Sequence, residues 1–306
     1  MRTLPVAAAA VAAAAMLLAG CTTASQDAGS DPTASDGGSA ASFDPTTITE
    51  DADVAAMVPE AVASDGKLTV GSNLEYAPVE FVDADGTTPV GLDIDIVTAV
   101  ANTMGLEVDV QNAGFDSIIP AIGSKFEVGF SAFSVTPERL ETVNMVSYFT
   151  AGSQFAVAQG NPDGVSADDL CGVTVGVQTG TIQQGELDTL SKECTDAGNE
   201  AIDVLPYDSQ ADVTTNLAGG KLQAMYADSP IIAYAVEQTG GTVETLGDIH
   251  DAAPYGAVVA KDDTELAQAV QAALQKLMDD GVLAQVADVW GSGEAVLDTA
   301  ELNPAG

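Results

Sequence analysis

Residues 89–130 read PVGLDIDIVTAVANTMGLEVDVQNAGFDSIIPAIGSKFEVGF, and this stretch decides the fold. Its first half carries apolar residues at helical spacing and then a glycine that ends the helix, namely Ile94, Val97, Ala101, Met104 and Gly105. Residues 106–110 alternate like a strand, a second helix follows around Ile118, and 127–130 form a third short strand. With the strand predicted at 68–70, the order is β-α-β-α-β, which is typical of a parallel sheet with crossover helices.

A second series of the same kind follows further along the chain. Strands are predicted at 173–177, 202–205 and 222–226, and helices at 181–194, 213–220 and 230–238. The folded part, from about Asp65 to Leu297, therefore contains two α/β units of similar size. Its length of about 230 residues is sufficient for two lobes.

The N-terminus has the pattern of an export signal. Arg2 gives a positive start, and residues 6–19 form an apolar run that is shorter than the about 20 residues of a membrane-spanning helix. The run ends in Leu-Ala-Gly-Cys, which resembles the cleavage motif of bacterial lipoproteins. We therefore predict a signal peptide over 1–20 and lipidation of Cys21, which would hold the exported protein on the outer face of the cell membrane. An ordinary cleaved signal with a chance cysteine is the alternative.

Residues 21–60 are rich in Ser, Thr, Ala, Asp and Gly and show little apolar patterning. Such a segment buries too little surface to offset the entropy of ordering it. We therefore predict a flexible spacer between the lipid and the folded part. No later segment of the sequence is apolar enough to cross a membrane.

The charge of the chain is strongly negative. Without Arg2 the chain has seven basic residues against 46 acidic ones, and its formal net charge is −39. Proteins that bind nucleic acid through its phosphates need basic patches, so this class is excluded, and phosphorylated ligands are disfavoured. A solvated acidic surface that keeps the protein soluble explains the charge without a specific function.

Two cysteines remain once Cys21 is assigned to the lipid. In an exported protein, Cys171 and Cys194 indicate a disulfide, which would stabilise the fold by roughly 3 kcal/mol in the chain-entropy model. Two buried free thiols are the alternative. Neither cysteine is predicted to be catalytic, because the single histidine, His250, is not placed beside them by the sequence.

Six segments, in order, resemble one family of proteins. They are GKLTVGSNLEYAP from Gly66, PVGLDIDIVTAV from Pro89, GFDSIIPAI from Gly114, SAFSVTPER from Ser131, VGVQTGT from Val175 and YAD from Tyr226. Together they are similar to the amino-acid-binding proteins of bacterial ABC importers, the family of solute-binding proteins that includes the histidine-, glutamine- and lysine/arginine/ornithine-binding proteins. The resemblance extends from about residue 66 to residue 290.

The resemblance implies the type II periplasmic-binding-protein fold, an α/β fold of two lobes joined by two hinge strands, with the ligand in the cleft between them. Lobe I would comprise 61–153 and 258–306, and lobe II would comprise 154–257. The hinge strands would lie near 154–158 and 255–260. The expected partners are a free amino acid, an ABC permease and its ATPase, and the protein is expected to be a monomer without a cofactor or a metal.

The resemblance also carries ligand contacts onto individual residues. Arg139 would grip the α-carboxylate of the ligand, which suits the fork of a guanidinium. The backbone at Thr181 and Ile182, at the start of a predicted helix, would add N–H groups to it. Ser134 would contact both the carboxylate and the ammonium. The remaining predicted contacts are Asp228 and Ala132 to the α-ammonium, Tyr76 and Phe115 around the side chain, and Asn73 and Gln178 at its tip.

Each assignment has a plainer structural alternative. Arg139 is the only arginine after the signal, and a structural salt bridge would also explain it. Asp228 precedes Pro230 and would also serve as a helix cap. Tyr76 and Phe115 would also serve as core residues.

The function predicted from the sequence is therefore binding of an amino acid and its delivery to an importer. Asn73 is neutral where binders of cationic amino acids often carry an acid, so a neutral polar ligand such as glutamine is favoured, a cationic one comes next, and an acidic one is least expected. A detached sensory subunit is one alternative. A dehydratase or lyase on the same fold is less favoured, because no Ser-His-Asp set, metal cluster or phosphate-binding loop is visible.

Overall fold

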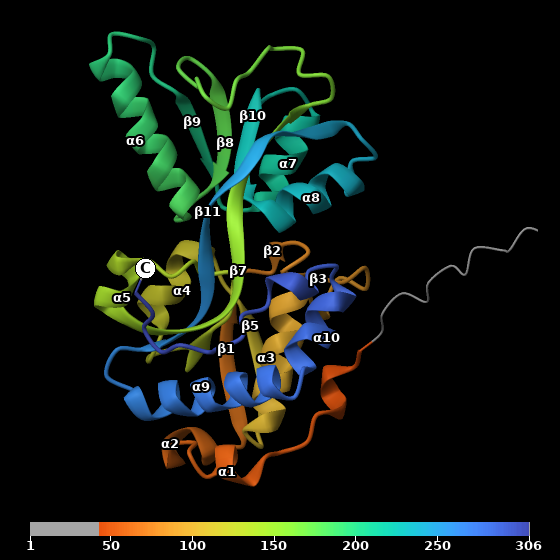
Figure 1. Ribbon diagram of the computed structural model, residues 1–306, viewed down its shortest axis with the longest axis vertical. Coiled ribbons are helices and arrows are strands. Elements are labelled where there is room, and N and C mark those ends of the chain that lie inside the picture. Colours follow the sequence, from red (N-terminus) through yellow and green to blue (C-terminus); the bar gives the residue numbers. More distant parts are fainter. Residues whose placement is uncertain (1–42, 306) are drawn as a thin grey trace, which may run out of the picture. The chain divides into compact units, whose positions relative to one another are not determined.

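Eight strands form one mixed sheet through the part of the chain that the computed structural model describes, residues 43–305 (Figure 1). The spatial order is β5-β1-β6-β11-β7-β10-β8-β9. The strands are β1 (Lys67–Ser72), β5 (Glu107–Asn112), β6 (Val128–Gly129), β7 (Val143–Ala158), β8 (Thr174–Gln178), β9 (Asp203–Tyr207), β10 (Ala224–Asp228) and β11 (Val243–Ala260). Residues 43–305 belong to one compact unit.

The first lobe contains the predicted β-α-β-α-β series. Strand β1 pairs in parallel with β5 and β6, and the connections between these strands contain α3 (Leu92–Thr103) and α4 (Phe115–Ala121). The C-terminal helices α9 (Thr264–Asp279) and α10 (Val282–Val289) pack against α3. The sequence did not reveal a second sheet, in which β2 (Glu75–Tyr76), β3 (Glu80–Val82) and β4 (Pro89–Val90) are antiparallel neighbours.

The second lobe contains the second predicted series. Strands β9 and β10 flank β8 in parallel, and α6 (Ile182–Asp196), α7 (Gln210–Ala218) and α8 (Ser229–Gln238) follow β8, β9 and β10 in turn. A disulfide joins Cys171 to Cys194 near the end of α6, as the sequence predicted. This lobe has its own apolar core, in which Val175, Val177 and Leu187 are buried.

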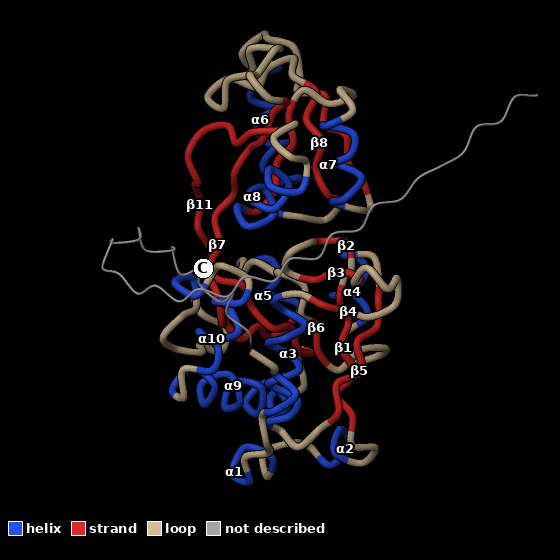
Figure 2. The backbone as a smooth tube through the Cα atoms, turned by 90° about the vertical axis from the view of Figure 1, so that its right-hand side faces the viewer, coloured by secondary structure: helices blue, strands red, loops and turns tan. Residues whose placement is uncertain are grey.

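Strands β7 and β11 pass from one lobe to the other (Figure 2). They are antiparallel, and their pairing has three register shifts, between Leu246 and His250, between His250 and Ala253, and between Tyr255 and Gly256. The hinge strands expected near 154–158 and 255–260 are thus the ends of much longer strands. This arrangement confirms the expected fold class, an α/β fold of two lobes with two hinge strands.

The segment before β1 is more ordered than the sequence suggested. It contains a short 3₁₀ helix, Pro45–Thr47, and the helices α1 (Ala52–Ala55) and α2 (Glu60–Ala63). The backbone N–H of Asp51 donates to the carbonyl of Thr103 at 3.0 Å, and Val54 is buried. The expectation of a flexible spacer up to residue 60 is therefore wrong for 45–60. The predicted signal peptide and Cys21 lie outside the described residues.

Among the described residues, no helix combines the length and apolar character needed to span a bilayer.

Candidate functional site

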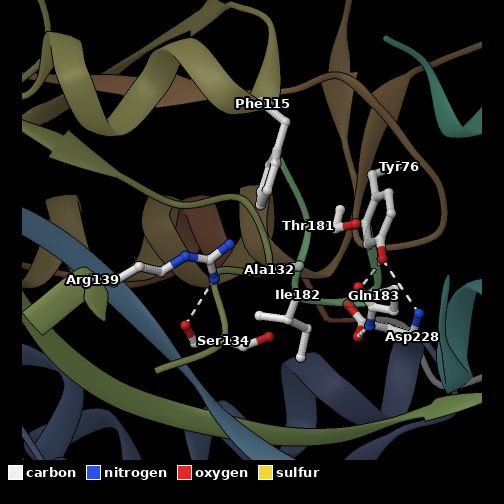
Figure 3. Close-up of a pocket in the computed structure, with 9 residues that line it drawn as sticks. All are labelled: Tyr76, Phe115, Ala132, Ser134, Arg139, Thr181, Ile182, Gln183 and Asp228. Carbon is white, nitrogen blue, oxygen red and sulfur yellow. Dashed lines mark hydrogen bonds between the residues drawn. The ribbon is translucent and has the colours of Figure 1, made fainter. Parts of the chain in front are cut away.

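A pocket lies where the two lobes meet, and its empty space of about 210 Å³ includes a part open to solvent (Figure 3). It is lined by Tyr76, Phe115, Ala132, Ser134, Arg139, Thr181, Ile182, Gln183 and Asp228. Eight of the ten residues predicted as ligand contacts are among these, and Gln183 is an addition.

Arg139 supplies the positive charge of this pocket. It lies in the short helix α5 (Pro137–Thr142), where the Thr136 side chain caps the first turn by accepting from the Arg139 backbone N–H. The guanidinium donates to the Ser134 carbonyl at 2.8 Å and, across the lobes, to the Gly180 carbonyl at 3.3 Å. No carboxylate forms a salt bridge with it among residues 43–305, so the alternative of a structural salt bridge is not supported.

Aromatic rings hold the guanidinium from the side of α4. The Phe115 and Phe133 rings stack on each other, and the Arg139 guanidinium carbon lies 5.6 Å and 5.5 Å from their centroids. Burial lowers the pKa of the Arg139 guanidinium, but an arginine remains a cation near neutrality. The pocket therefore presents a fixed cation whose charge is not neutralised by an adjacent carboxylate.

Asp228 supplies the negative charge, and Figure 3 shows it on the side of the pocket opposite Arg139. It lies at the end of β10 and precedes α8, but its side chain makes no capping hydrogen bond, so the cap interpretation does not hold. Its Oδ2 accepts from the hydroxyls of Tyr76 at 2.9 Å and Tyr255 at 2.8 Å, and its Oδ1 accepts from Gln183 Nε2 at 2.7 Å. Burial raises the pKa of Asp228, whereas these donors and Arg139 act in the opposite direction.

Backbone groups complete the pocket. Thr181 caps α6 through its side chain, and Ile182 and Gln183 begin the helix, so their N–H groups belong to the first turn and have no intrahelical acceptor. A helix of 15 residues presents a partial positive charge there. Ala132 has φ +50°, an uncommon backbone conformation for a residue other than glycine, and its N–H donates to Asp93 Oδ2 at 2.8 Å. Strained backbone of this kind is concentrated at binding sites.

Asn73 and Gln178 are buried but do not line the pocket. Gln178 Nε2 donates to Asn73 Oδ1 at 2.9 Å and to the Asp208 carbonyl at 3.2 Å, while Asn73 Nδ2 donates to the Ala113 carbonyl at 3.0 Å. The two amides therefore connect the lobes to each other. The structure therefore does not place Asn73 and Gln178 on the pocket wall, where they were predicted to contact the end of the ligand side chain.

Several buried polar atoms without partners belong to residues near this amide pair in the chain or linked to it by hydrogen bonds. Among the described residues, Ser72 Oγ, Glu80 Oε2 and both amide atoms of Gln210 are buried without a hydrogen-bond partner. Ser72 adjoins Asn73 in the chain, and Gln210 begins α7 two residues after Asp208. Glu80 is connected through Ser131, whose hydroxyl donates to Glu80 Oε1 at 2.8 Å and accepts from the Asn73 N–H at 3.0 Å. Buried polar atoms of this kind are rare, and a bound water or a polar group of a ligand would supply the missing partners.

Sequence reasoning singled out neither Gln183, which lines the pocket, nor Glu80 and Gln210, whose buried polar atoms lack partners. The only local signal was for Glu80, a charged residue between Val79 and Phe81 in an apolar segment. The glutamines sit in the first turns of amphipathic helices, where a polar residue is ordinary. Among residues 43–305, no group of three or more His, Cys, Asp or Glu side chains is arranged to hold a metal ion.

We expect buried acids to make the stability of the ligand-free protein depend on pH. Burial raises the pKa of Asp93 to about 6 and that of Glu80 well above its ordinary value, so both bind protons more tightly when folded than when unfolded, where carboxyls titrate near about 4. Protonation of these two acids therefore favours the folded state. This contribution to the free energy of unfolding is fully present at low pH and is lost as pH rises through the pKa values of the folded state. We expect the melting temperature to rise as pH falls from about 8 to about 5.5.

Differential scanning fluorimetry across that range checks this expectation. Asp93→Asn should reduce the slope of melting temperature against pH, even if the variant is less stable overall. A melting temperature that falls on mild acidification would contradict the expectation.

Comparisons with known proteins agree with this geometry. Residues 68–293 match the model of the bacterial extracellular solute-binding proteins, family 3. The arginine-binding protein ArgT of Corynebacterium glutamicum is 36% identical over 253 residues, which is 82% of this chain and 83% of that protein. A probable ABC transporter arginine-binding protein, ArtJ of Chlamydia trachomatis, is 30% identical over 74% of this chain and 86% of its own length.

Solved structures agree as well. An ancestral arginine-binding protein bound to arginine superposes with a TM-score of 0.68 at 31% identity, over 74% of this chain and 98% of its own. The same values of TM-score and identity hold for an ancestral arginine-binding protein bound to glutamine, over 74% of this chain and 97% of that one. These relatives are named as binding proteins, which supports binding of an amino acid rather than catalysis. The chain belongs to the bacterial extracellular solute-binding proteins, family 3, and is accordingly an exported amino-acid-binding protein of the ABC-transporter class.

Proposed function

We propose that this protein binds a cationic L-amino acid, with L-arginine as the first candidate, and delivers it to an ABC permease and its ATPase. The observation that carries the proposal is the pair Arg139 and Asp228, a cation and an anion on opposite sides of one small cavity and from different lobes. An α-amino acid carries the complementary charges on one carbon atom. Charge-assisted hydrogen bonds at both ends would fix its orientation.

The contacts to the α-carbon substituents follow from this orientation. The α-carboxylate would lie on Arg139, with N–H groups from Ser134 and from Thr181 and Ile182 at the start of α6. The α-ammonium would lie on Asp228 with the Ala132 carbonyl and the Ser134 hydroxyl. The Tyr76 hydroxyl now bonds Asp228, so the ligand ammonium would replace it there.

The side chain would lie between Tyr76 and Phe115 and extend toward the unpartnered atoms. Glu80 Oε2 is a buried carboxyl oxygen without a donor, and a guanidinium supplies such donors. The relatives named for arginine favour the same ligand. We therefore place cationic ligands ahead of neutral polar ones, the reverse of the order expected from Asn73 alone.

Glutamine is the second candidate ligand. The unpartnered amide of Gln210 suits another amide, and one related ancestral protein was solved with glutamine bound. Acidic ligands remain least favoured, because Arg139 is the only Lys or Arg that lines the cavity in the described part of the chain. An unpaired second carboxylate would be costly to bury.

The proposal also covers the membrane anchor, the spacer, the oligomeric state and the lobe boundaries. We propose that Cys21 anchors the protein through a lipid, that residues 21–44 form the spacer, and that the protein acts as a monomer. The lobe boundaries are proposed at 61–153 with 258–306 for lobe I, and at 154–257 for lobe II. A detached sensory subunit is the alternative role, and its ligand would be the same.

A thermal-shift screen of the twenty amino acids tests the proposed ligand. A ligand that binds only the native state at 100 times its Kd stabilises by about 2.7 kcal/mol, so the melting temperature should rise most with L-arginine. D-arginine is a matched control, because inverting the α-carbon separates the two charged groups from their partners. A larger shift with glutamate or aspartate would contradict the proposal.

A further inference from the structure

Three carboxyl groups are buried in or next to the pocket: Asp228 lines it, Glu80 pairs across β2 and β3 with the pocket residue Tyr76, and Asp93 accepts from the N–H of the pocket residue Ala132. Glu80, Asp93 and Asp228 come from β3, α3 and β10, and each is almost completely inaccessible to solvent. The negative charges of Asp93 and Asp228 both raise the pKa of Glu80. The charge of Glu80 in turn raises the pKa values of Tyr76 and Tyr148. Arg139, which attracts Asp228, is the one Lys or Arg on the pocket wall within residues 43–305.

The three acids differ in their hydrogen bonds. Asp228 has three donors, and Asp93 has two, from the Tyr148 hydroxyl at 2.7 Å and the Ala132 N–H. Glu80 has a single donor, the Ser131 hydroxyl, and its second oxygen has none. A buried carboxylate without donors is costly, so of the three Glu80 is the acid that most needs a proton in this arrangement.

A protonated Glu80 and an ionised Glu80 recognise different ligands. The acid form offers an O–H donor, which suits the carbonyl of an amide or urea group. The ionised form is only an acceptor, which suits a guanidinium or ammonium group. The choice between the two forms is therefore also a choice between neutral and cationic side chains.

We propose that Glu80 is a specificity-determining residue that exchanges a proton for the charge of the ligand. This inference rests on the proposed function. Glu80 is neutral in the empty site. When a cationic side chain binds, the proton of Glu80 passes to the solvent, and the carboxylate that remains pairs with the bound cation. A neutral side chain leaves the proton in place. Burial and the charge of Asp93, which raise the pKa of Glu80, favour the proton in the empty site.

Linkage gives the pH dependence of binding. Where the empty site holds the proton and the occupied site does not, one proton is released for each ligand, and affinity rises by up to tenfold per pH unit. Arginine should therefore bind more tightly as pH rises from about 5.5 to about 8.5, and the neutral isostere citrulline should not. The preference for arginine over citrulline should grow by the same factor.

Isothermal titration calorimetry of the wild-type chain tests this directly. Titrations at one pH in buffers of different ionisation enthalpy count the protons released, and we expect a value approaching one for arginine and near zero for citrulline and glutamine. This count needs no variant, so it does not depend on whether a substitution folds.

Variants then assign the proton. Glu80→Gln, neutral at every pH, should remove both the proton release and the pH dependence of arginine affinity. Glu127→Gln is the matched control, because Glu127 is a partly buried acid of the same lobe that accepts from the Thr69 N–H and shares no hydrogen bond with Ser131, the partner of Glu80. It should retain the wild-type behaviour.

Arginine binding with no proton release and with an affinity independent of pH would overturn the inference and leave the proposed function intact. Proton release that persists in Glu80→Gln would also overturn it, since the proton would then belong to another group. Absence of binding by arginine, glutamine and citrulline alike would overturn the proposed function and this inference with it.

Discussion

Arg139→Ala is expected to abolish measurable binding of the amino acid while leaving the protein folded. Removing one partner of a buried charge pair costs about 2–5 kcal/mol, which is roughly thirty-fold to several-thousand-fold in affinity. The side chain contributes two hydrogen bonds to backbone carbonyls, one of them across the lobes, so the fold depends on it less than the ligand does. Calorimetry measures the affinity, and a thermal melt confirms the fold.

Two controls make this result specific. Lys125→Ala removes one positive charge from the same lobe outside the cavity and should bind normally. Agmatine, which is arginine without its α-carboxylate, should bind the wild type weakly, and Arg139→Ala should no longer distinguish it from arginine. A variant that still prefers arginine over agmatine by the wild-type factor would show that Arg139 does not hold the carboxylate.

Asp228→Asn is expected to cause a loss of comparable size. The substitution keeps the shape of the side chain but removes the negative charge that would face the α-ammonium, and it places an N–H₂ group beside the hydroxyls of Tyr76 and Tyr255. Loss of the charge pair should again weaken binding by about 2–5 kcal/mol. Calorimetry with arginine measures the change.

The matched control for this variant is Asp203→Asn, an exposed acid of the same lobe that accepts from the Thr174 hydroxyl. It should bind as the wild type does. The probe is 5-guanidinopentanoate, which lacks the α-ammonium and should bind the wild type and Asp228→Asn with similar affinity. Unchanged arginine affinity in Asp228→Asn would remove Asp228 from the site.

Local periodicity was sufficient to predict much of the fold. The helix at Leu92–Thr103 and the strands on either side of it are specified by apolar spacing within the segment. The long strands β7 and β11 were expected only at their ends, and only from the family resemblance. Strand β7 is buried on both faces along much of its length and loses the alternation that identifies a strand. Strand β11 is largely exposed or partly exposed before Tyr255 and is interrupted by three register shifts. The helices at 52–63 are each four residues long, too short for a periodic signal.

The candidate site was predictable where a motif fixes the backbone, and less so where contacts cross between lobes. Arg139 and Thr181 are held by caps within their own segments, and both line the cavity. Asn73 and Gln178 are 105 residues apart and pair with each other, a contact that no local pattern contains. Glu80 is buried and bonded to Ser131, 51 residues away, and a single sequence does not display such a contact.

The paired strands β7 and β11 connect the two lobes and therefore connect the two halves of the site. At each of the three register shifts the ladder is already interrupted, so bending there breaks few hydrogen bonds. A rotation of one lobe about these positions would change the separation of Arg139 and Asp228, because the two residues belong to different lobes and line the same pocket.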